Sequence, residues 1–198
     1  AARRLPVGLA AVHVDGRAEF PRDGLPVDVA LDEPHIGDLV ERDAADQVLG
    51  RRTVEFKGQT INLQPPWRRL NLRQGLIETA EIDIAEHPTQ ESLAAAMRSC
   101  GLEPKPGLTR GKLIEGLMSD FLEPTLIQPT FLYDYPRDIS PLAKSKPGHP
   151  GTVERFEGFV CGMELCNAFT ELNDPLDQEE RFREMGLDYA ADDEERHP

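Results

Sequence analysis

The stretch from Glu154 to Arg183, ERFEGFVCGMELCNAFTELNDPLDQEERFR, decides the fold that we predict for this chain. Two runs rich in apolar residues meet at Cys161-Gly162, and a glycine between two such runs is typical of a β-hairpin. The second run leads to Asp174-Pro175, where aspartate is a favoured helix N-cap and proline fits the first helical turn. The sequence therefore predicts a β-hairpin that is followed directly by a helix.

The second strand of this hairpin presents two different faces. A period of two residues puts Asn167, Phe169 and Glu171 on one face and smaller side chains on the other. An amide, an aromatic ring and a carboxylate side by side could hold a compact cationic ligand. An exposed polar face of an antiparallel strand has the same pattern, so the alternation alone leaves both interpretations open.

The same alternation separates Glu164 from Asn167 and Glu171, because it puts Glu164 on the opposite face. These side chains can serve one pocket only if the strand kinks or bulges between them, or if Glu164 reaches around from the turn. A shared pocket would therefore require an irregularity between Gly162 and Cys166.

Apolar patterns predict further elements before this hairpin. Two short strands flank Lys57-Gly58-Gln59. Three helices follow, the first two with Asn71 and Thr89 as favoured N-cap residues, and a buried strand comes after them. The segment 144–151, with two prolines and two glycines, is predicted to be an exposed loop. The strands are predicted at 53–56, 60–63 and 127–133. The three helices are predicted after Asn71, from Thr89 to Ser99, and from Thr109 to Leu122.

The formal charge of −14 over 198 residues limits what the chain binds by itself. An autonomous nucleic-acid-binding module needs clustered Lys and Arg for its phosphate contacts, so this balance argues against one. No apolar run approaches the roughly 18 residues of a membrane-spanning helix. The three cysteines are odd in number and lack metal-ligand spacing, which favours reduced thiols in the cytoplasm.

The string GMELCNAFTELNDP, from Gly162 to Pro175, resembles a signature of class II lysyl-tRNA synthetases. Further blocks resemble the same family and stand in its order over roughly Gln47 to Asp193. This resemblance implies an α+β fold with an antiparallel sheet of the class II synthetase type and a helical insertion at about 71–123, incomplete in this chain. The further blocks are Pro66–Leu70, Thr109–Leu113, Leu126–Lys144 and Arg155–Glu157.

The resemblance divides the chain into three parts. Residues 47–187 are predicted to be a partial catalytic domain of this family. The segment 1–46 is predicted to hold a hairpin, a loop and a helix, and its first 35 residues or so have no counterpart that we identify in the family. The closing segment 188–198 is acidic and nearly without apolar anchors, so we expect it to be disordered.

The resemblance also implies a function, the ATP-dependent activation of L-lysine and its transfer to tRNA(Lys) by a cytoplasmic, homodimeric lysine--tRNA ligase. Asn167, Phe169 and Glu171 would bind lysine, because a desolvated ammonium needs a carboxylate partner. We expect Glu171 to face a recess with room for this guest. Glu157 and Glu164 would meet Mg²⁺ bound to the ATP phosphates. For Glu164 to serve the same pocket as Asn167 and Glu171, we predict an irregularity near Gly162 to Cys166, and unbroken alternation there would count against the metal role of Glu164. No residue is expected to act as a covalent catalyst.

The family's three class-defining motifs and its N-terminal anticodon-binding barrel do not occur in this sequence. Two of these motifs carry arginines for the phosphates, and the loss of one such donor commonly costs about 10² to 10³ in rate. The chain alone is therefore expected to be inactive. Tyr133, Tyr135 and Ser140 are expected close to the pocket, but the sequence assigns them no role.

Two other functions remain open at this stage. A paralogue that attaches lysine to a protein, such as an elongation factor, would have the same lysine pocket. A non-catalytic remnant could instead act as an interaction module. The longer reading frame distinguishes these hypotheses. The presence or absence of the anticodon-binding barrel decides on the paralogue, and the absence of both flanking arginine motifs would favour the non-catalytic remnant.

Overall fold

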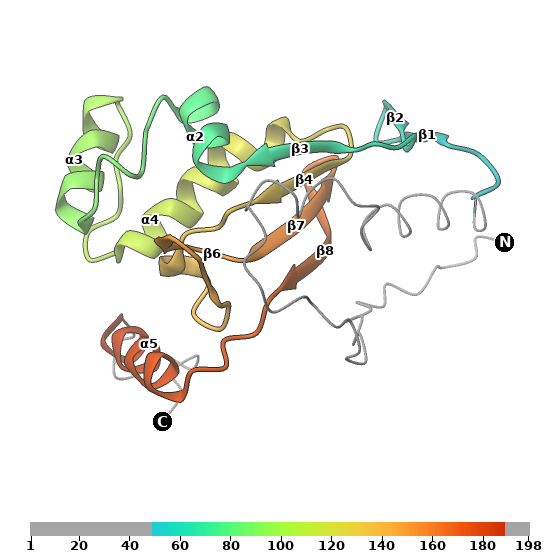
Figure 1. The fold of residues 1–198 in the computed structure, drawn as a ribbon. Coiled ribbons are helices and arrows are strands. Elements are labelled where there is room, and N and C mark those ends of the chain that lie inside the picture. Colours follow the sequence, from blue (N-terminus) through green and yellow to red (C-terminus); the bar gives the residue numbers. More distant parts are fainter. Residues whose placement is uncertain (1–48, 189–198) are drawn as a thin grey trace, which may run out of the picture.

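The computed structural model describes residues 49–188 (Figure 1). The predictions for residues 1–46 and for the tail beyond Asp188 concern residues outside this range. Within it, no helix is long and apolar enough to span a membrane. The order of helices and strands agrees with the α+β fold class predicted from the sequence.

A four-stranded sheet contains the β-hairpin predicted around Cys161-Gly162. The β4–β7 and β7–β8 pairs are antiparallel, as predicted, whereas β3 and β4 are parallel. Parallel neighbours need a long crossover, and residues 72–129 supply it with a group of helices. The strand order is β3 (Arg68–Asn71), β4 (Thr130–Tyr133), β7 (Arg155–Val160) and β8 (Met163–Phe169).

The helices of this crossover begin where the sequence predicts them. The side chains of Asn71, Thr89 and Thr109 each accept a hydrogen bond from the backbone amide three residues later. Figure 1 shows the helices gathered at one end of the sheet. They are α2 (Leu72–Ala80), α3 (Gln90–Ser99) and α4 (Arg110–Leu117).

The last of these helices changes its winding before it ends. The prediction of one helix from Thr109 to Leu122 is confirmed only up to Leu117, because the π-helical segment η2 (Met118–Leu122) follows. The 3₁₀ turn η3 (Glu123–Thr125) contains Pro124, which cannot continue a regular helix. The sequence predicts the stop at this proline, but not the wider turn before it.

The main hydrophobic core lies between these helices and the sheet. The apolar stripes of α2, α3 and α4 converge on one another and on η2. A methyl group at Gly75 would lie 2.9 Å from Cδ1 of Leu122, so α2 approaches η2 as closely as a glycine allows. Core side chains that are at most 1% exposed include Leu72, Leu76, Leu93, Leu113, Ile114, Leu117, Leu122 and Leu132.

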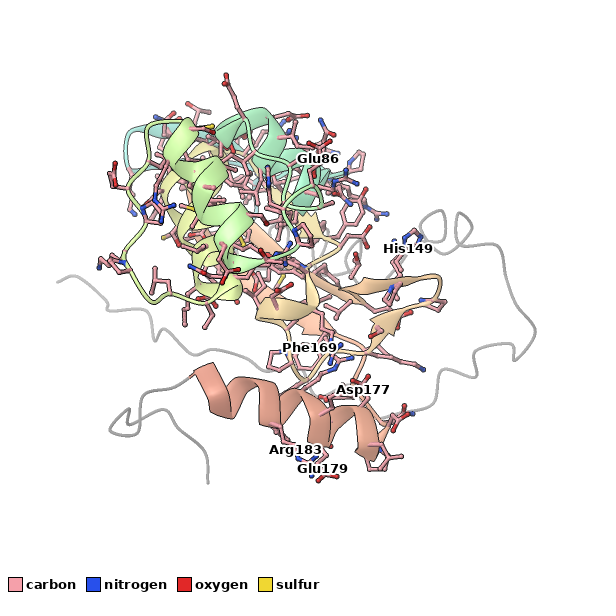
Figure 2. All side chains as sticks on the ribbon, turned by 90° about the vertical axis from the view of Figure 1, so that its left-hand side faces the viewer. Glu86, His149, Phe169, Asp177, Glu179 and Arg183 are labelled. Carbon is pink, nitrogen blue, oxygen red and sulfur yellow. The ribbon has the colours of Figure 1, made fainter. Side chains whose placement is uncertain are left out.

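Two small hairpins flank the main sheet. The first, β1 (Thr53–Phe56) with β2 (Gln59–Asn62), is confirmed. The prediction of a loop at 144–151 is wrong, because β5 (Ser145–Lys146) pairs with β6 (His149–Val153). Pro147-Gly148 forms the turn with Gly148 at a φ of 75°, which is the pairing of proline and glycine that a tight turn favours. His149 lies on this hairpin (Figure 2).

The helix α5 (Pro175–Asp188) follows the main hairpin, as predicted. The carboxylate of Asp174 accepts hydrogen bonds from the amides of Leu176 and Asp177, at 2.9 and 3.3 Å. Arg181 anchors α5 to the segment before β5, because its guanidinium donates to the carbonyl oxygen of Ala143 at 2.6 Å. Figure 1 shows α5 set apart from the insertion helices.

Candidate functional site

The β7–β8 turn is held against the insertion. Cys161 and Gly162 both have positive φ, 53° and 66°, as a two-residue hairpin turn requires. Their amides donate to the carbonyl oxygens of residues 127 and 126, each at 3.0 Å. A methyl group at Gly162 would lie 3.2 Å from the carbonyl oxygen of Glu123. The turn is therefore both locally encoded and fixed by tertiary contacts.

The predicted irregularity in the second strand is confirmed. Gly158 pairs with Cys166, but the next residue, Phe159, pairs with Glu164, which leaves Leu165 as an extra residue. Such a bulge reverses the alternation across the extra residue. Glu164 consequently lies on the same face as Asn167, which pairs with Glu157. The hairpin thus brings together Glu157, Glu164 and Asn167.

Glu157 is the buried centre of this group, with 5% of its surface exposed. The hydroxyl of Tyr135 donates to one carboxylate oxygen at 2.6 Å. The amide nitrogen of Asn167 donates to the other oxygen at 3.1 Å, and the guanidinium of Arg155 donates to that same oxygen. Since both oxygens accept hydrogen bonds and an arginine balances the charge, a carboxylate can be buried here.

Glu164 is the exposed carboxylate of the group. Partial desolvation, followed by the nearby charge of Glu157, raises its pKa, while Arg155 and a hydrogen bond from Asn167 act in the opposite direction. Desolvation and the charges of Glu157 and Glu164 likewise raise the pKa of Glu123. Three carboxylates therefore share one region of negative potential, which favours a cationic guest.

The hydroxyl of Tyr135 stays protonated in this environment. Burial, followed by the charge of Glu157, raises its pKa far above the ordinary tyrosine value. A protonated phenol can donate to Glu157, which is the role that the 2.6 Å contact requires.

The carboxylates fit a metal ion that takes most of its ligands from phosphate and water rather than from the protein. Among residues 49–188, no group of three or more His, Cys, Asp or Glu side chains could hold a metal ion. Glu157 already accepts hydrogen bonds on both oxygens, whereas Glu164 is open to solvent. Magnesium commonly uses one or two protein carboxylates and completes its shell with phosphate and water, so this donor set suits it.

The three predicted lysine-binding residues lie along β8 and just beyond its end. Asn167 contacts Glu157, and Phe169, labelled in Figure 2, is 38% exposed. Glu171 is exposed and forms an isolated bridge with Ala143. The expected recess around Glu171 is thus not formed by the described residues, because β8 is the edge strand of their sheet and Glu171 lies past it.

A cavity of about 630 Å³ lies elsewhere and contains none of the five predicted site residues. Its cationic side chains already have anionic partners. Arg73 makes two hydrogen bonds of 2.6 Å to Asp83, and Arg110 pairs with Asp138 at 2.6 Å. The other two arginines of the lining, Arg137 and Arg181, share Asp177. Its lining joins α2, α4, the segment 134–141, β6 and α5.

Sequence reasoning missed the role of Arg155 and left Tyr135 and Ser140 without one. In the structure, the guanidinium carbon of Arg155 lies over the ring of Tyr135, 4.7 Å from its centroid, and the guanidinium donates to Oγ of Ser140 at 2.9 Å. Alternation along β7 does put Arg155 and Glu157 on one face. The other partners come from a segment some 15 to 22 residues earlier, and no local pattern signals them.

Known proteins match this chain over most of its length. The family model of class II tRNA synthetases (D, K and N) matches residues 35–198. A lysine--tRNA ligase of Roseiflexus castenholzii is 49% identical over 156 residues, which are 78% of this chain and 32% of that protein. A lysine--tRNA ligase of Moorella thermoacetica is 46% identical over 153 residues, 77% of this chain and 31% of that protein.

The chain spans about a third of the length of the curated relatives that it matches. The matched region nevertheless includes the whole described part, with its sheet, its helical insertion and the carboxylate group on the β7–β8 hairpin. A family model that covers residues 35–198 is decisive for family membership. This chain belongs to the class II tRNA synthetase family that comprises the D, K and N enzymes.

Proposed function

We propose that this chain contributes part of the active site of a lysine--tRNA ligase, which activates L-lysine with ATP and transfers it to tRNA(Lys). The observation that carries the proposal is the bulged β7–β8 hairpin. It gathers Glu157, Glu164 and Asn167 on one face, in a chain 44–49% identical to three proteins named lysine--tRNA ligase. A cytoplasmic location and a homodimeric assembly belong to the same proposal.

Lysine would be recognised by charge and shape along β8. Glu171 would pair with the ε-ammonium, Asn167 would orient the amino acid, and Phe169 would cover its aliphatic stem. An unpaired desolvated ammonium costs several kcal/mol, so the pocket needs this carboxylate. Because Glu171 is exposed in the described part of the chain, the wall that encloses it would come from other residues of the complete protein.

ATP would bind beside the carboxylates, with Glu164 as the open protein ligand of Mg²⁺ and Glu157 next to it. When bound, this ion would offset negative charge on the phosphates. The lysine carboxylate would attack the α-phosphorus, breaking its bond to the bridging oxygen, and the products would be lysyl-adenylate and pyrophosphate. Positioning and electrostatics would supply most of the rate enhancement, so no covalent protein nucleophile is required.

The substitution Glu171→Gln tests this assignment in the complete protein. It removes the charge that would pair with the ε-ammonium, so KM for lysine in ATP–pyrophosphate exchange should rise by about 100-fold, whereas KM for ATP should stay within about twofold. Glu180→Gln, which changes an exposed carboxylate on α5, is the matched control and should alter neither constant.

Two outcomes would contradict the proposal. One is an unchanged KM for lysine in the Glu171→Gln variant. The other is a complete protein that shows no lysine-dependent exchange, or that transfers lysine to a protein rather than to tRNA(Lys). No observation on residues 49–188 or on the relatives favours the protein-lysylating or the non-catalytic alternative.

A further inference from the structure

Arg155 lies at the centre of the candidate site, where it contacts two predicted site residues, Glu157 and Asn167. Its side chain is 18% exposed. The guanidinium donates to the carbonyl oxygen of Ile139 at 2.8 Å and to Oγ of Ser140 at 2.9 Å. It also donates to Glu157 and to Oδ1 of Asn167, the latter at 3.3 Å. All three guanidinium nitrogens are thus used.

These contacts depend on the planar fork of an arginine. Nη1 contacts Ile139 and Ser140, Nη2 contacts Glu157, and Nε contacts Asn167. The guanidinium carbon also lies over the Tyr135 ring, 4.7 Å from its centroid. A lysine ammonium carries the same charge but is a single donor centre, so it cannot reach these partners together.

The contacts fix the orientation of the Asn167 amide. Its oxygen accepts from Arg155, and its nitrogen donates to Glu157, which itself accepts from Arg155. The three side chains therefore close a ring of hydrogen bonds in which each amide atom has a distinct partner. The carboxylate of Glu157 can only accept, so it selects the nitrogen end of the amide, and Arg155 supplies the donor that the oxygen end needs.

We propose that Arg155 is a positioning residue for lysine activation, which holds the amide of Asn167 in its binding orientation before lysine arrives. The inference rests on the proposed function. Its physical basis is preorganisation, since a displacement of about 1 Å in a site can cost about 100-fold in rate. Arg155 itself would touch neither substrate.

The test uses ATP–pyrophosphate exchange by the complete protein carrying Arg155→Lys, Asn167→Ala, or both. The first variant keeps the charge and loses the fork, so kcat/KM for lysine should fall by about 100-fold. If Arg155 acts through Asn167, the double variant should be no more than about threefold worse than Asn167→Ala alone. Arg183→Lys, at an arginine whose side chain is 76% exposed, is the control and should be inert.

Ser140→Ala gives a second readout and should destabilise the fold less than Arg155→Lys does. It removes one acceptor of the guanidinium and keeps the other, the carbonyl oxygen of Ile139. It should lower kcat/KM for lysine by about fivefold, and this loss should disappear in the Asn167→Ala background. A merely structural Arg155 would give the opposite pattern. The variants would then lose thermal stability, keep kcat/KM per folded molecule, or show losses that multiply with Asn167→Ala.

The two proposals fail in different ways. A wild-type protein without lysine-dependent exchange overturns the proposed function. An active wild-type protein whose Arg155 and Asn167 variants have independent, multiplying effects overturns only the positioning role of Arg155.

Discussion

Glu157 and Glu164 were predicted to share one role, but the structure gives them different environments. Glu157 is 5% exposed and accepts hydrogen bonds from Tyr135, Asn167 and Arg155. Glu164 is exposed and has a raised pKa. A buried carboxylate whose oxygens already accept hydrogen bonds holds its neighbours in place. An exposed carboxylate whose charged form is destabilised is stabilised when a cation binds to it. Of the two, Glu164 is therefore the better candidate for direct contact with a ligand.

At the same scale, Glu123→Gln should stabilise the protein at neutral pH. Desolvation and two nearby carboxylates raise the pKa of Glu123, so the folded state binds its proton more tightly than the unfolded state does. Stability that depends on this proton is present below the unfolded pKa and is lost as the pH rises through the raised value. The melting temperature should therefore increase in the variant at pH 7, but not at about pH 4.

Glu86→Gln, which changes an exposed carboxylate (Figure 2), serves as the control for this experiment. A gain of the same size in both variants would point to the net charge of −14 rather than to the local carboxylates. A gain for Glu123→Gln that persists at acid pH would also contradict the prediction.

At the scale of the element, the β7–β8 hairpin depends on two departures from a regular ladder. The bulge at Leu165 brings Glu164 to the face of Asn167, and the turn at Cys161-Gly162 docks on residues 126 and 127. The need for a bulge was predictable, because two carboxylates assigned to one pocket stood on opposite faces of a regular strand. The bulge lies opposite Gly158, where the two strands pack closely. A methyl group on Gly158 would lie 2.7 Å from Sγ of Cys166.

Gly162→Ala should destabilise this turn by about 1 to 2 kcal/mol, because Gly162 combines a φ of 66° with close approach to the carbonyl oxygen of Glu123. Gly116→Ala is the matched control within α4. A methyl group at Gly116 meets nothing within 4 Å, so this substitution should stabilise by about 0.5 to 1 kcal/mol through helix propensity. Denaturant unfolding of both variants measures the difference, and equal effects would refute the turn argument.

At the scale of the whole molecule, the described part combines a well-packed region with an open edge. Insertion helices cover one end of the sheet with residues that are almost fully buried. At the other edge, β8 pairs only with β7 and exposes 55% of Leu165 and 38% of Phe169. The proposed lysine pocket along β8 would therefore need surfaces beyond those described, in agreement with a chain that spans about a third of the length of its relatives.

The docking of α5 on the rest of the molecule should depend on one buried arginine. Arg181, which is 2% exposed, donates to Ala143, Ser145 and Asp177. Because its removal leaves a buried carbonyl oxygen without this charged donor, Arg181→Ala should cost at least about 2 kcal/mol. It should also increase hydrogen exchange in both 140–145 and 175–188, which mass spectrometry can measure.

Arg183→Ala is the control on the same helix, where Arg183 pairs with Glu179 on the exposed side (Figure 2). An exposed ion pair contributes less than about 1 kcal/mol, so this variant should retain its exchange pattern. Equal exchange in both variants would mean that Arg181 does not anchor α5.

The sequence by itself determined the features that depend on neighbouring residues. N-caps at Asn71, Thr89 and Asp174 are confirmed because capping is a contact between a side chain and amides two or three residues away. The Cys161-Gly162 turn is local for the same reason. The Pro147-Gly148 turn is equally local. Its flanking strands are too short and too polar to be predicted as strands, so the sequence indicates only a loop there.

Only the tertiary structure decided how distant segments meet. The parallel strands β3 and β4 are neighbours in the sheet although 58 residues, from 72 to 129, separate them in the sequence. The network of Arg155, Glu157 and Tyr135 joins β7 to a segment 15 to 22 residues earlier. Local periodicity carries no information about such partners. Their positions follow from burial, since a charged group that leaves water must find its hydrogen bonds wherever the packed chain offers them.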